Sequence, residues 1–236
     1  MSLALPTTSP RRALRLDRSR QAAPQVFERL REMIVSLELV PGSVLSRADL
    51  TAWFGVSQTP IRDALLKLSE EGLVDIFPQH ATVVSRIDVA SARQAHFLRL
   101  SLELEVVRTL AASPSAPLVA RLRAQIELQT ALQAREAYAE FIVADQAFHR
   151  LMYEAAGVSD LFDLVRRRSG HVDRLRRLDL PSTGKTRAVV RDHRKVIDAI
   201  ERGDVDAATQ ALRDHLSGTL QKIDQIVARH PEYLAA

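Results

Sequence analysis

The stretch Gly55-Val-Ser-Gln-Thr-Pro-Ile-Arg-Asp-Ala-Leu65 decides the fold of the first third of this chain. A glycine that can adopt a left-handed conformation ends one short helix, and Ser57 then begins the next helix as its cap. The second helix carries small polar residues and one arginine in its first two turns, and it buries Ile61, Leu65 and Leu68. Two short helices joined by so tight a turn are typical of a helix-turn-helix.

The segments on either side complete the pattern of a winged helix-turn-helix. Apolar residues recur at helical spacing over 24–38, which predicts a first helix. Ser46 can cap the next helix, and Asp49 three residues later gives the arrangement of a capping box. After the helix pair, the β-type runs 73–77 and 81–85 predict two short strands joined by a hairpin, the wing.

Composition limits the class of protein further. A chain of 236 residues is long enough for two modest domains with their own cores. The absence of cysteine excludes disulfides and thiolate metal sites. There is no run of about 18 apolar residues, so we expect no transmembrane helix, no membrane partner and a cytoplasmic location.

The formal net charge of +4 comes from the N-terminus. Residues 1–20 hold five arginines and one aspartate, and the rest of the chain is balanced. Such a segment could touch phosphates, but a solvated, disordered leader is the commoner case. We therefore expect residues 1–22 to be a disordered basic tail, and the overall charge is weak support for DNA binding.

Beyond Asp88 the chain is expected to be almost wholly helical. It is expected to form six helical segments, and turns that contain glycine or proline mark four of the breaks between them. These segments are 88–112, 116–134, 136–156, 159–179, 185–202 and 204–229. We therefore predict a mainly α fold, with a winged helix-turn-helix domain over 23–86, an all-α bundle of six to seven helices over 87–230 and a C-terminal tail over 231–236.

The start of the second helix of the pair is where we expect DNA contacts. In this fold that end enters the major groove, where arginine and glutamine form paired hydrogen bonds with bases and hydroxyl groups hold phosphates. The candidate contacts, from this helix, the helix before it and the wing, are Arg47, Ser57, Gln58, Thr59, Arg62 and His80. Plainer alternatives exist, because Ser57 also serves as a helix cap and Arg62 could be half of a surface ion pair.

Residues 25–85 resemble the winged-helix domain of the GntR family of bacterial transcription regulators. The matching residues lie in the turn before the helix pair, in both helices and before the first strand. They are Val40-Pro-Gly-Ser43, Leu45-Ser46, Asp49-Leu50, Gly55-Val-Ser57, Thr59-Pro-Ile-Arg-Asp-Ala-Leu65 and Glu71-Gly-Leu73. Gln58 stands where the family commonly has arginine, which implies a different operator preference.

Four polar side chains fall on the apolar faces of predicted helices in the second half of the chain. They are Asp145, His149, His193 and His215. Asp145 and His149 are one helical turn apart and hence neighbours on one face. One buried neutral histidine with a hydrogen bond is ordinary, but four converging ligand-type groups are costly to bury without a shared partner. A divalent metal would satisfy all four, with zinc expected first and nickel, cobalt or manganese also suitable.

Residues 88–229 resemble the all-helical effector domain called FCD, found in the FadR-like branch of the same family. The matching residues are Arg99, Leu102-Glu103, Asp145, Phe148-His149, Asp192-His-Arg194, Ile197, Arg213 and His215-Leu216. Metal-binding members use an aspartate and three histidines at these places, which implies the same four ligands here. The resemblance also implies that the metal binds the carboxylate of a small organic acid. Arg99, His171 and Arg174 are candidates for binding that acid, although Arg99 could instead pair with Glu103 on an exposed face.

Together these expectations describe a DNA-binding transcriptional repressor, not an enzyme, that responds to a small organic acid bound at a metal centre. It is expected to bind a nearly palindromic operator as a homodimer, because one winged-helix unit contacts too few bases to find a site in a genome. The apolar 88–112 helix could pack against both core and partner. Two alternatives remain: a metal-dependent hydrolase or lyase that uses the Asp/His₃ site with a bound water, and a helical interaction protein whose polar cluster is only structural.

Overall fold

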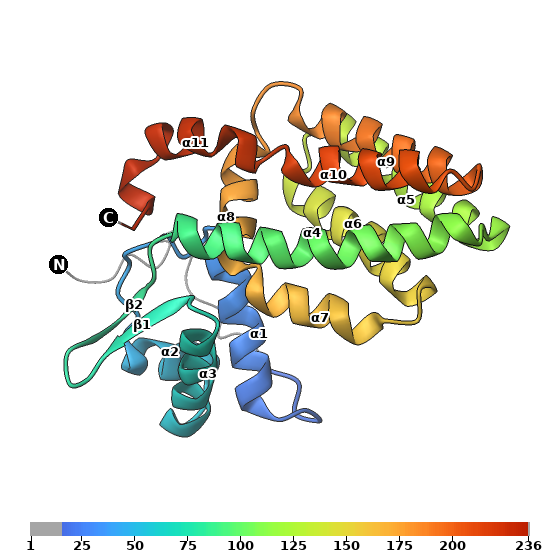
Figure 1. Ribbon diagram of the computed structural model, residues 1–236. Coiled ribbons are helices and arrows are strands. Elements are labelled where there is room, and N and C mark those ends of the chain that lie inside the picture. Colours follow the sequence, from blue (N-terminus) through green and yellow to red (C-terminus); the bar gives the residue numbers. More distant parts are fainter. Residues whose placement is uncertain (1–15, 236) are drawn as a thin grey trace. The chain divides into compact units, whose positions relative to one another are not determined.

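The computed structural model describes residues 16–235, and Figure 1 shows their helices and strands. The chain divides into two compact units. One consists of Met1–Ala92 together with Val227–Ala236, and the other is Arg93–Ile226. The first carries short helices and a β-hairpin and the second is all helical, which confirms the predicted mainly α fold.

The first unit is a winged helix-turn-helix. Its elements are α1 Ala22–Val35, α2 Arg47–Phe54, α3 Gln58–Glu70, β1 Val74–Phe77 and β2 Ala81–Val84. The two strands pair antiparallel, from Val74 opposite Val84 to Phe77 opposite Ala81. Apolar side chains of the three helices and of the hairpin form one buried cluster, which fixes α3 against α1 and α2. The predicted helix pair and wing are thus confirmed.

The turn between α2 and α3 follows from its sequence. Ser46 Oγ accepts a hydrogen bond of 3.2 Å from the backbone N–H of Asp49, which is the expected cap of α2. Gly55 has a φ of 64°, a left-handed conformation that glycine adopts without strain, and it ends α2. Ser57 occupies the N-cap position of α3, but its side chain makes no capping hydrogen bond. The prediction that its hydroxyl caps α3 is therefore wrong, and that side chain lies exposed at the surface.

The described part of the predicted N-terminal tail is tied to α1. Gln25 is buried, and its Oε1 accepts a hydrogen bond of 2.7 Å from the backbone N–H of Asp17. Its Nε2 donates to the backbone oxygen of Asp17 at 2.9 Å. The disorder predicted for residues 1–22 therefore does not hold for residues 16–22, while residues 1–15 lie outside the described residues.

Residues near the C-terminal end also pack onto the first unit. Ile87 and Leu234 form a parallel β-bridge, and the backbone N–H of Ile87 donates to the oxygen of Tyr233. The structure therefore pairs residues that the sequence assigned to a tail over 231–236. It also places both limits of the second unit inside the predicted range 87–230.

The second unit is built from α4, which begins in the first unit, to α10. These helices are α4 Val89–Ala112, α5 Ala116–Ala134, α6 Tyr138–Ala155, α7 Ser159–Arg168, α8 Gly170–Asp179, α9 Lys185–Glu201 and α10 Val205–Ser217. The chain then continues through the 3₁₀-helix η1 Leu220–Lys222, α11 Ile223–Arg229 and the 3₁₀-helix η2 Pro231–Tyr233.

Two segments predicted as continuous helices are each interrupted. The segment 159–179 divides into α7 and α8 at Ser169, whose Oγ donates a hydrogen bond of 2.7 Å to Asp173 Oδ2. The segment 204–229 divides after α10 at Gly218 and resumes in η1 and α11. The side-chain hydrogen bond of Ser169 competes with a continuous helix at the first break, whereas Gly218 at the second break keeps a helical φ of −59°. Both helices were therefore predicted too long.

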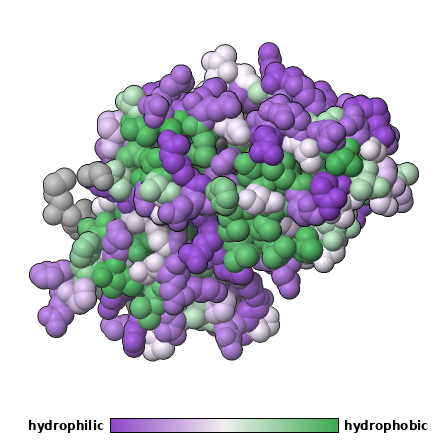
Figure 2. Space-filling model, viewed as in Figure 1, coloured by the Kyte–Doolittle hydropathy of each residue, from purple (hydrophilic) through white to green (hydrophobic). Residues whose placement is uncertain are grey.

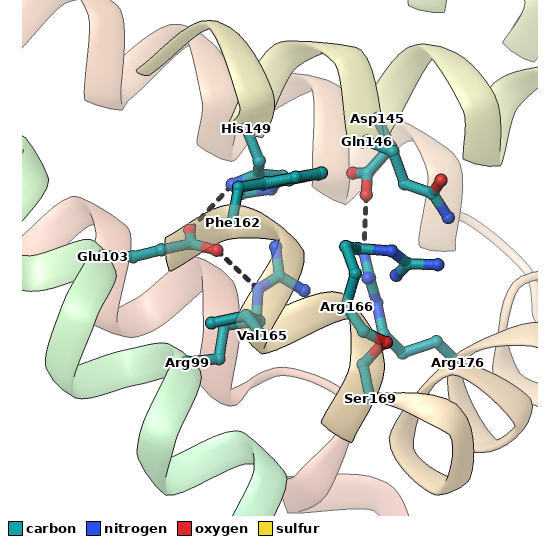
Figure 3. A pocket seen from close by; sticks show the side chains of 10 residues that line it. All are labelled: Arg99, Glu103, Asp145, Gln146, His149, Phe162, Val165, Arg166, Ser169 and Arg176. Carbon is teal, nitrogen blue, oxygen red and sulfur yellow. Dashed lines mark hydrogen bonds and ion pairs between the residues drawn. The ribbon is translucent and has the colours of Figure 1, made fainter. Parts of the chain in front are cut away.

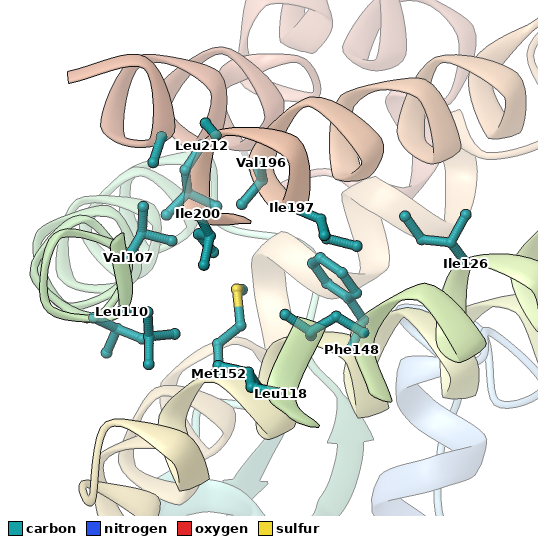
Figure 4. Close-up of a cluster of buried hydrophobic side chains, with 14 of the residues drawn as sticks. Val107, Leu110, Leu118, Ile126, Phe148, Met152, Val196, Ile197, Ile200 and Leu212 are labelled. Atoms are coloured by element: carbon teal, nitrogen blue, oxygen red, sulfur yellow. The ribbon is translucent and has the colours of Figure 1, made fainter. Parts of the chain in front are cut away.

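Apolar side chains of α4, α5, α6, α9 and α10 form the core of the second unit (Figure 4). Its members include Val107, Leu110, Leu118, Ile126, Phe148, Met152, Val196, Ile197, Ile200 and Leu212. Polar groups are embedded in the same core, since the ring of Phe148 stacks on that of His193 with 4.1 Å between centroids. Within residues 16–235, no helix is long and apolar enough to cross a membrane.

Candidate functional site

The residues expected to contact DNA are all exposed on the first unit. They are Arg47, Ser57, Gln58, Thr59, Arg62 and His80. Four of them cluster at the N-terminal end of α3, and Arg62 is one turn beyond Gln58, so these two side chains share a face. The free backbone N–H groups and the dipole of a helix N-terminus favour phosphate there. Arg47 begins α2, and His80 lies in the turn between β1 and β2.

The structure brings Asp145, His149, His193 and His215 together inside the second unit. One ligand-type atom from each lies within 4.8 Å of the others. His193 Nε2 is 3.1 Å from His215 Nε2 and 3.6 Å from Asp145 Oδ1. His215 Nε2 is 3.3 Å from His149 Nε2. Three helices, α6, α9 and α10, therefore aim these atoms at one point in the core.

Neighbouring groups fix which nitrogen of two of these imidazoles faces the cluster. Gln129 Nε2 donates to the backbone oxygen of Ala144, so its Oε1 is the atom 2.8 Å from His193 Nδ1. Glu103 Oε2 lies 2.8 Å from His149 Nδ1, an ion-pair contact whose alignment is not that of a hydrogen bond. An oxygen acceptor beside Nδ1 requires the proton on that nitrogen, and Nε2 then presents a lone pair. Two lone pairs therefore point toward His215 Nε2, which carries one proton at most when that ring is neutral.

Asp145 adds a negatively charged atom to the same point. Its Oδ2 accepts a hydrogen bond of 2.7 Å from Arg176 Nη2, whereas its buried Oδ1 has no hydrogen-bond partner among the described residues. Burial alone would raise the pKa of Asp145, but Arg176 and then the surrounding imidazoles hold it well below the usual value. An ionised, unpaired carboxylate oxygen in a core is costly unless a cation accompanies it.

Burial keeps two of the histidines in their neutral form. Burial lowers the pKa of His193 to about 3 and that of His215 well below its usual value. Both rings are therefore neutral near pH 7, the form that binds a metal. Converging nitrogen lone pairs and one carboxylate oxygen form a donor set that suits a divalent cation such as zinc. The buried Asp/His cluster could therefore hold a metal ion.

A pocket opens beside this cluster (Figure 3). The space between its walls is about 280 Å³, a volume that includes the open solvent at its mouth. The lining residues are Arg99, Glu103, Asp145, Gln146, His149, Phe162, Val165, Arg166, Ser169 and Arg176. Three arginines against two acids make the lining net positive before any metal is counted. Because Asp145 and His149 belong to both sites, an anion in the pocket would lie next to the Asp/His cluster.

Arg99 is the one acid-binding candidate that lines this pocket. Its Nε donates a hydrogen bond of 2.6 Å to Glu103 Oε1, as the alternative prediction required. The pair is not on an exposed face, however, because the Glu103 side chain is almost fully buried. Burial alone would raise the pKa of Glu103, but Arg99 and His149 lower it to about 2.

The other two acid-binding candidates lie elsewhere. Arg174 is fully buried, and its Nη2 is 3.0 Å from His171 Nδ1. Its Nε donates to the backbone oxygen of Gly170 at 3.2 Å. Neither side chain is among those that line the pocket. The pocket contains Arg166 and Arg176 instead, which the sequence analysis did not single out.

Gln129 was not predicted as part of the cluster, although its position in the sequence indicates that it is a buried polar residue. This glutamine follows Leu122 and Ile126 on the apolar stripe of α5, where a polar side chain needs a partner. By contrast, no sequence pattern distinguishes Arg176 from Arg174 and the other arginines nearby. Only the direction of α8 after the bend at Ser169 aims Arg176 at Asp145.

The exposed end of α3 and the buried polar site define a class of two-part DNA-binding regulators, with a winged helix-turn-helix unit joined to a helical unit. Comparison with known families gives the same result. Residues 22–84 match the family described as bacterial regulatory proteins, gntR family, and residues 94–218 match the FCD domain. The chain belongs to the GntR family of bacterial regulatory proteins and carries a C-terminal FCD domain.

Individual relatives agree with this assignment. The chain is 37% identical over 210 residues to an HTH-type transcriptional regulator in an unstable DNA locus of Streptomyces ambofaciens, covering 89% of this chain and 88% of the relative. It is 28% identical over 211 residues to the HTH-type transcriptional repressor RspR of Escherichia coli, covering 89% and 92%. The solved structure of E. coli McbR/YncC is similar in fold, with a TM-score of 0.74 at 18% identity, covering 89% and 99%.

Family membership decides between the classes of function left open by the sequence. Members of the GntR family are DNA-binding transcriptional regulators, so this chain is a regulator and not a metal-dependent hydrolase or lyase. The same assignment explains the winged helix-turn-helix, which an enzyme or a purely structural helical protein would leave without a role.

Proposed function

We propose that this regulator is a repressor that binds its operator as a homodimer and responds to a small organic acid at a metal centre. The proposed metal site is supported by one observation. One unpaired carboxylate oxygen and three imidazole nitrogens converge within 4.8 Å in a buried core. Zinc accepts this donor set, and nickel, cobalt or manganese would also fit it. Elemental mass spectrometry of the purified protein would identify the ion.

The chain's own residues prepare the site. Gln129 and Glu103 orient two of the imidazoles, and Arg176 holds Asp145 so that Oδ1 faces the cluster. A bound divalent cation would supply open coordination positions for a carboxylate. Arg99 and Arg166, on the pocket wall, suit a second carboxylate or a hydroxyl group of the same molecule. His171 and Arg174 are not part of the proposed acid site, because neither side chain lines the pocket.

DNA binding is assigned to the exposed end of α3. Gln58 and Arg62 would contact bases in the major groove, while the hydroxyls of Ser57 and Thr59 would contact phosphates. Arg47 and His80 would contact the backbone or the minor groove from either side. Repression is supported by RspR, a relative along most of the chain that is named as a repressor.

A homodimer is supported by the surface of α4. Phe97 is 73% exposed, unusual for a large apolar side chain, and several leucines of the same helix are only partly buried. Figure 2 shows hydrophobic residues at the surface over this helix. A second copy that covers this surface would also supply the second winged-helix unit that a palindromic operator needs.

Acid binding would regulate DNA binding only through a difference in affinity. The acid must bind the DNA-free and DNA-bound forms differently, typically by about 1–3 kcal/mol, and DNA must change acid binding by the same factor. Mass spectrometry of small molecules retained through mild purification identifies the acid. Acid that binds the pocket without changing operator affinity would contradict this regulation.

One experiment with two variants tests both halves of the proposal. Arg62→Ala should lose specific binding to duplexes selected by the full-length protein, because paired hydrogen bonds to a base are removed. It should keep its metal content. His193→Ala should lose most of the metal, measured by elemental mass spectrometry, because one ligand and its link to Gln129 are gone, while its DNA affinity without acid should change little.

Two control variants match these substitutions in charge or side-chain type. Lys67→Ala removes a positive charge from the same helix at a side chain that lies over the Phe27 ring rather than at the N-terminal end. His230→Ala removes a histidine that stacks on Tyr233 outside the cluster. Specific DNA binding by Arg62→Ala equal to that of Lys67→Ala would reject the docking. Metal content of His193→Ala equal to that of His230→Ala would reject the metal site.

A further inference from the structure

Glu103 on α4 uses its two carboxylate oxygens for two different partners (Figure 3). Oε1 accepts from Arg99 Nε at 2.6 Å, and Oε2 lies 2.8 Å from His149 Nδ1. The residue is only 1% exposed, so water does not compete for either contact. One carboxylate therefore joins an arginine of the pocket wall to a residue of the Asp/His cluster.

Arg99 is free to take a second partner. Its Nε donates to Glu103, whereas its two Nη groups make no hydrogen bond within residues 16–235. Figure 3 shows its guanidinium among the residues that line the pocket. An anion bound there would share the positive charge that now acts on Glu103 first and then on Asp145 and Asp173. In a buried site this charge is weakly screened, so Glu103 would respond.

We propose that Glu103 is a positioning residue that couples anion binding at Arg99 to metal affinity at His149, an inference that rests on the metal and acid site proposed above. An anion at Arg99 weakens the hold of the guanidinium on Glu103. The carboxylate then draws more strongly on the His149 Nδ1–H, and His149 Nε2 becomes a better donor to a cation. By linkage, the metal strengthens anion binding by the same factor.

Glutamine at position 103 separates the two contacts. Glu103 uses a separate oxygen for each partner, and an amide has only one oxygen, so its NH₂ group must take the place of the oxygen beside Arg99 or beside His149. In Zn²⁺ competition against a chromophoric chelator, Glu103→Gln should weaken Zn²⁺ binding by about 10–100-fold, the usual effect of losing such an outer partner. Glu105→Gln is the matched control, because Glu105 on the same helix pairs with Arg108 at the surface. It should bind Zn²⁺ like the parent protein.

A double-mutant cycle tests the coupling without an identified acid. Arg99→Gln keeps a hydrogen-bond donor for Glu103 but removes the positive charge, as a bound anion would neutralise it. It should tighten Zn²⁺ binding severalfold in the parent protein and much less in the Glu103→Gln background. An equal shift in both backgrounds would show that Arg99 acts on the ion directly and would overturn the coupling.

A measurement on metal-free protein isolates the positioning role. The ¹⁵N shifts of the His149 ring should report a proton on Nδ1 in the parent protein and a loss of this preference in Glu103→Gln. If Glu103→Gln does not fold, judged by circular dichroism, Glu103→Asp replaces it, since the shorter side chain keeps its charge but cannot reach both partners. Zn²⁺ affinity within twofold of Glu105→Gln would overturn the inference alone. A parent protein that binds no divalent metal would overturn the proposed metal centre itself.

Discussion

Tyr153 is a fully buried phenol whose hydroxyl has no hydrogen-bond partner among the described residues. Its ring packs edge-on against Phe162, with 5.5 Å between centroids. Burial, and after it the negative charge of Glu103, raise the pKa of Tyr153 above its usual value, so the group stays neutral. A desolvated hydroxyl without a partner costs free energy, typically about 1–3 kcal/mol.

Tyr153→Phe should therefore leave the free energy of unfolding unchanged or raise it by about 1 kcal/mol, because the ring stays and the unsatisfied hydroxyl goes. Urea denaturation followed by circular dichroism measures this. A loss of more than about 1 kcal/mol would mean that the hydroxyl has a stabilising partner such as an ordered water.

At the scale of residues, the sequence revealed ligand-type side chains but not their partners. Asp145, His149 and His193 stood out because each is a polar group on an apolar helical face. No comparable sequence pattern identifies the residues that contact them. Gln129 and Arg176 come from other helices, and only the folded arrangement brings them to the cluster.

At the scale of elements, two serines in similar places have different roles. Ser46 accepts a capping hydrogen bond at the start of α2, whereas Ser57 stands at the start of α3 without one. Both positions are typical of helix caps, so sequence alone cannot separate them. The difference lies in side-chain orientation, which local pattern does not fix.

A pair of substitutions follows from this difference. Ser46→Ala should lower the free energy of unfolding by about 1 kcal/mol, the usual cost of losing a cap. Ser57→Ala should change it by less than about 0.5 kcal/mol, because no capping bond is lost, but it should weaken DNA binding through the lost hydroxyl. Denaturation and gel shift separate the two effects. Equal destabilisation by both substitutions would contradict the assignment.

Helix limits were the other error at this scale. The apolar spacing of 159–179 continues across Ser169, so it predicted one helix where the structure has α7 and α8. Periodicity indicates which face is buried, but it does not indicate where a side-chain hydrogen bond bends the chain. That bend matters, because it sets the direction of the segment that carries Arg176.

At the scale of the whole molecule, the buried cluster makes metal-free stability depend on pH. The unfolded state takes up protons on its histidines below about pH 6.5, whereas burial keeps His193 neutral until about pH 3. Stability is therefore lost as the pH falls through this range. His215 contributes with the same sign. Glu103, whose pKa falls to about 2, adds a loss only below about pH 4.5.

Urea unfolding in the presence of chelator should therefore show lower stability at pH 5 than at pH 7, by about 2 kcal/mol for His193 alone. Zn²⁺ at a large excess over its dissociation constant should raise stability at pH 7, because it binds the folded state. His193→Gln should reduce the difference between the two pH values. Equal metal-free stability at pH 5 and pH 7 would contradict the neutral, buried state of these rings.

The bridge between Ile87 and Leu234 has a consequence for how the molecule is made. The DNA-binding unit draws on residues 227–236, yet residues 93–226 are synthesised in between. A ribosome must therefore release the complete helical segment 93–226 before the DNA-binding unit gains its last contacts. A half-made chain would carry the winged helix without the Ile87–Leu234 bridge, so the ability to bind an operator should mature only after the helical segment 93–226 has emerged.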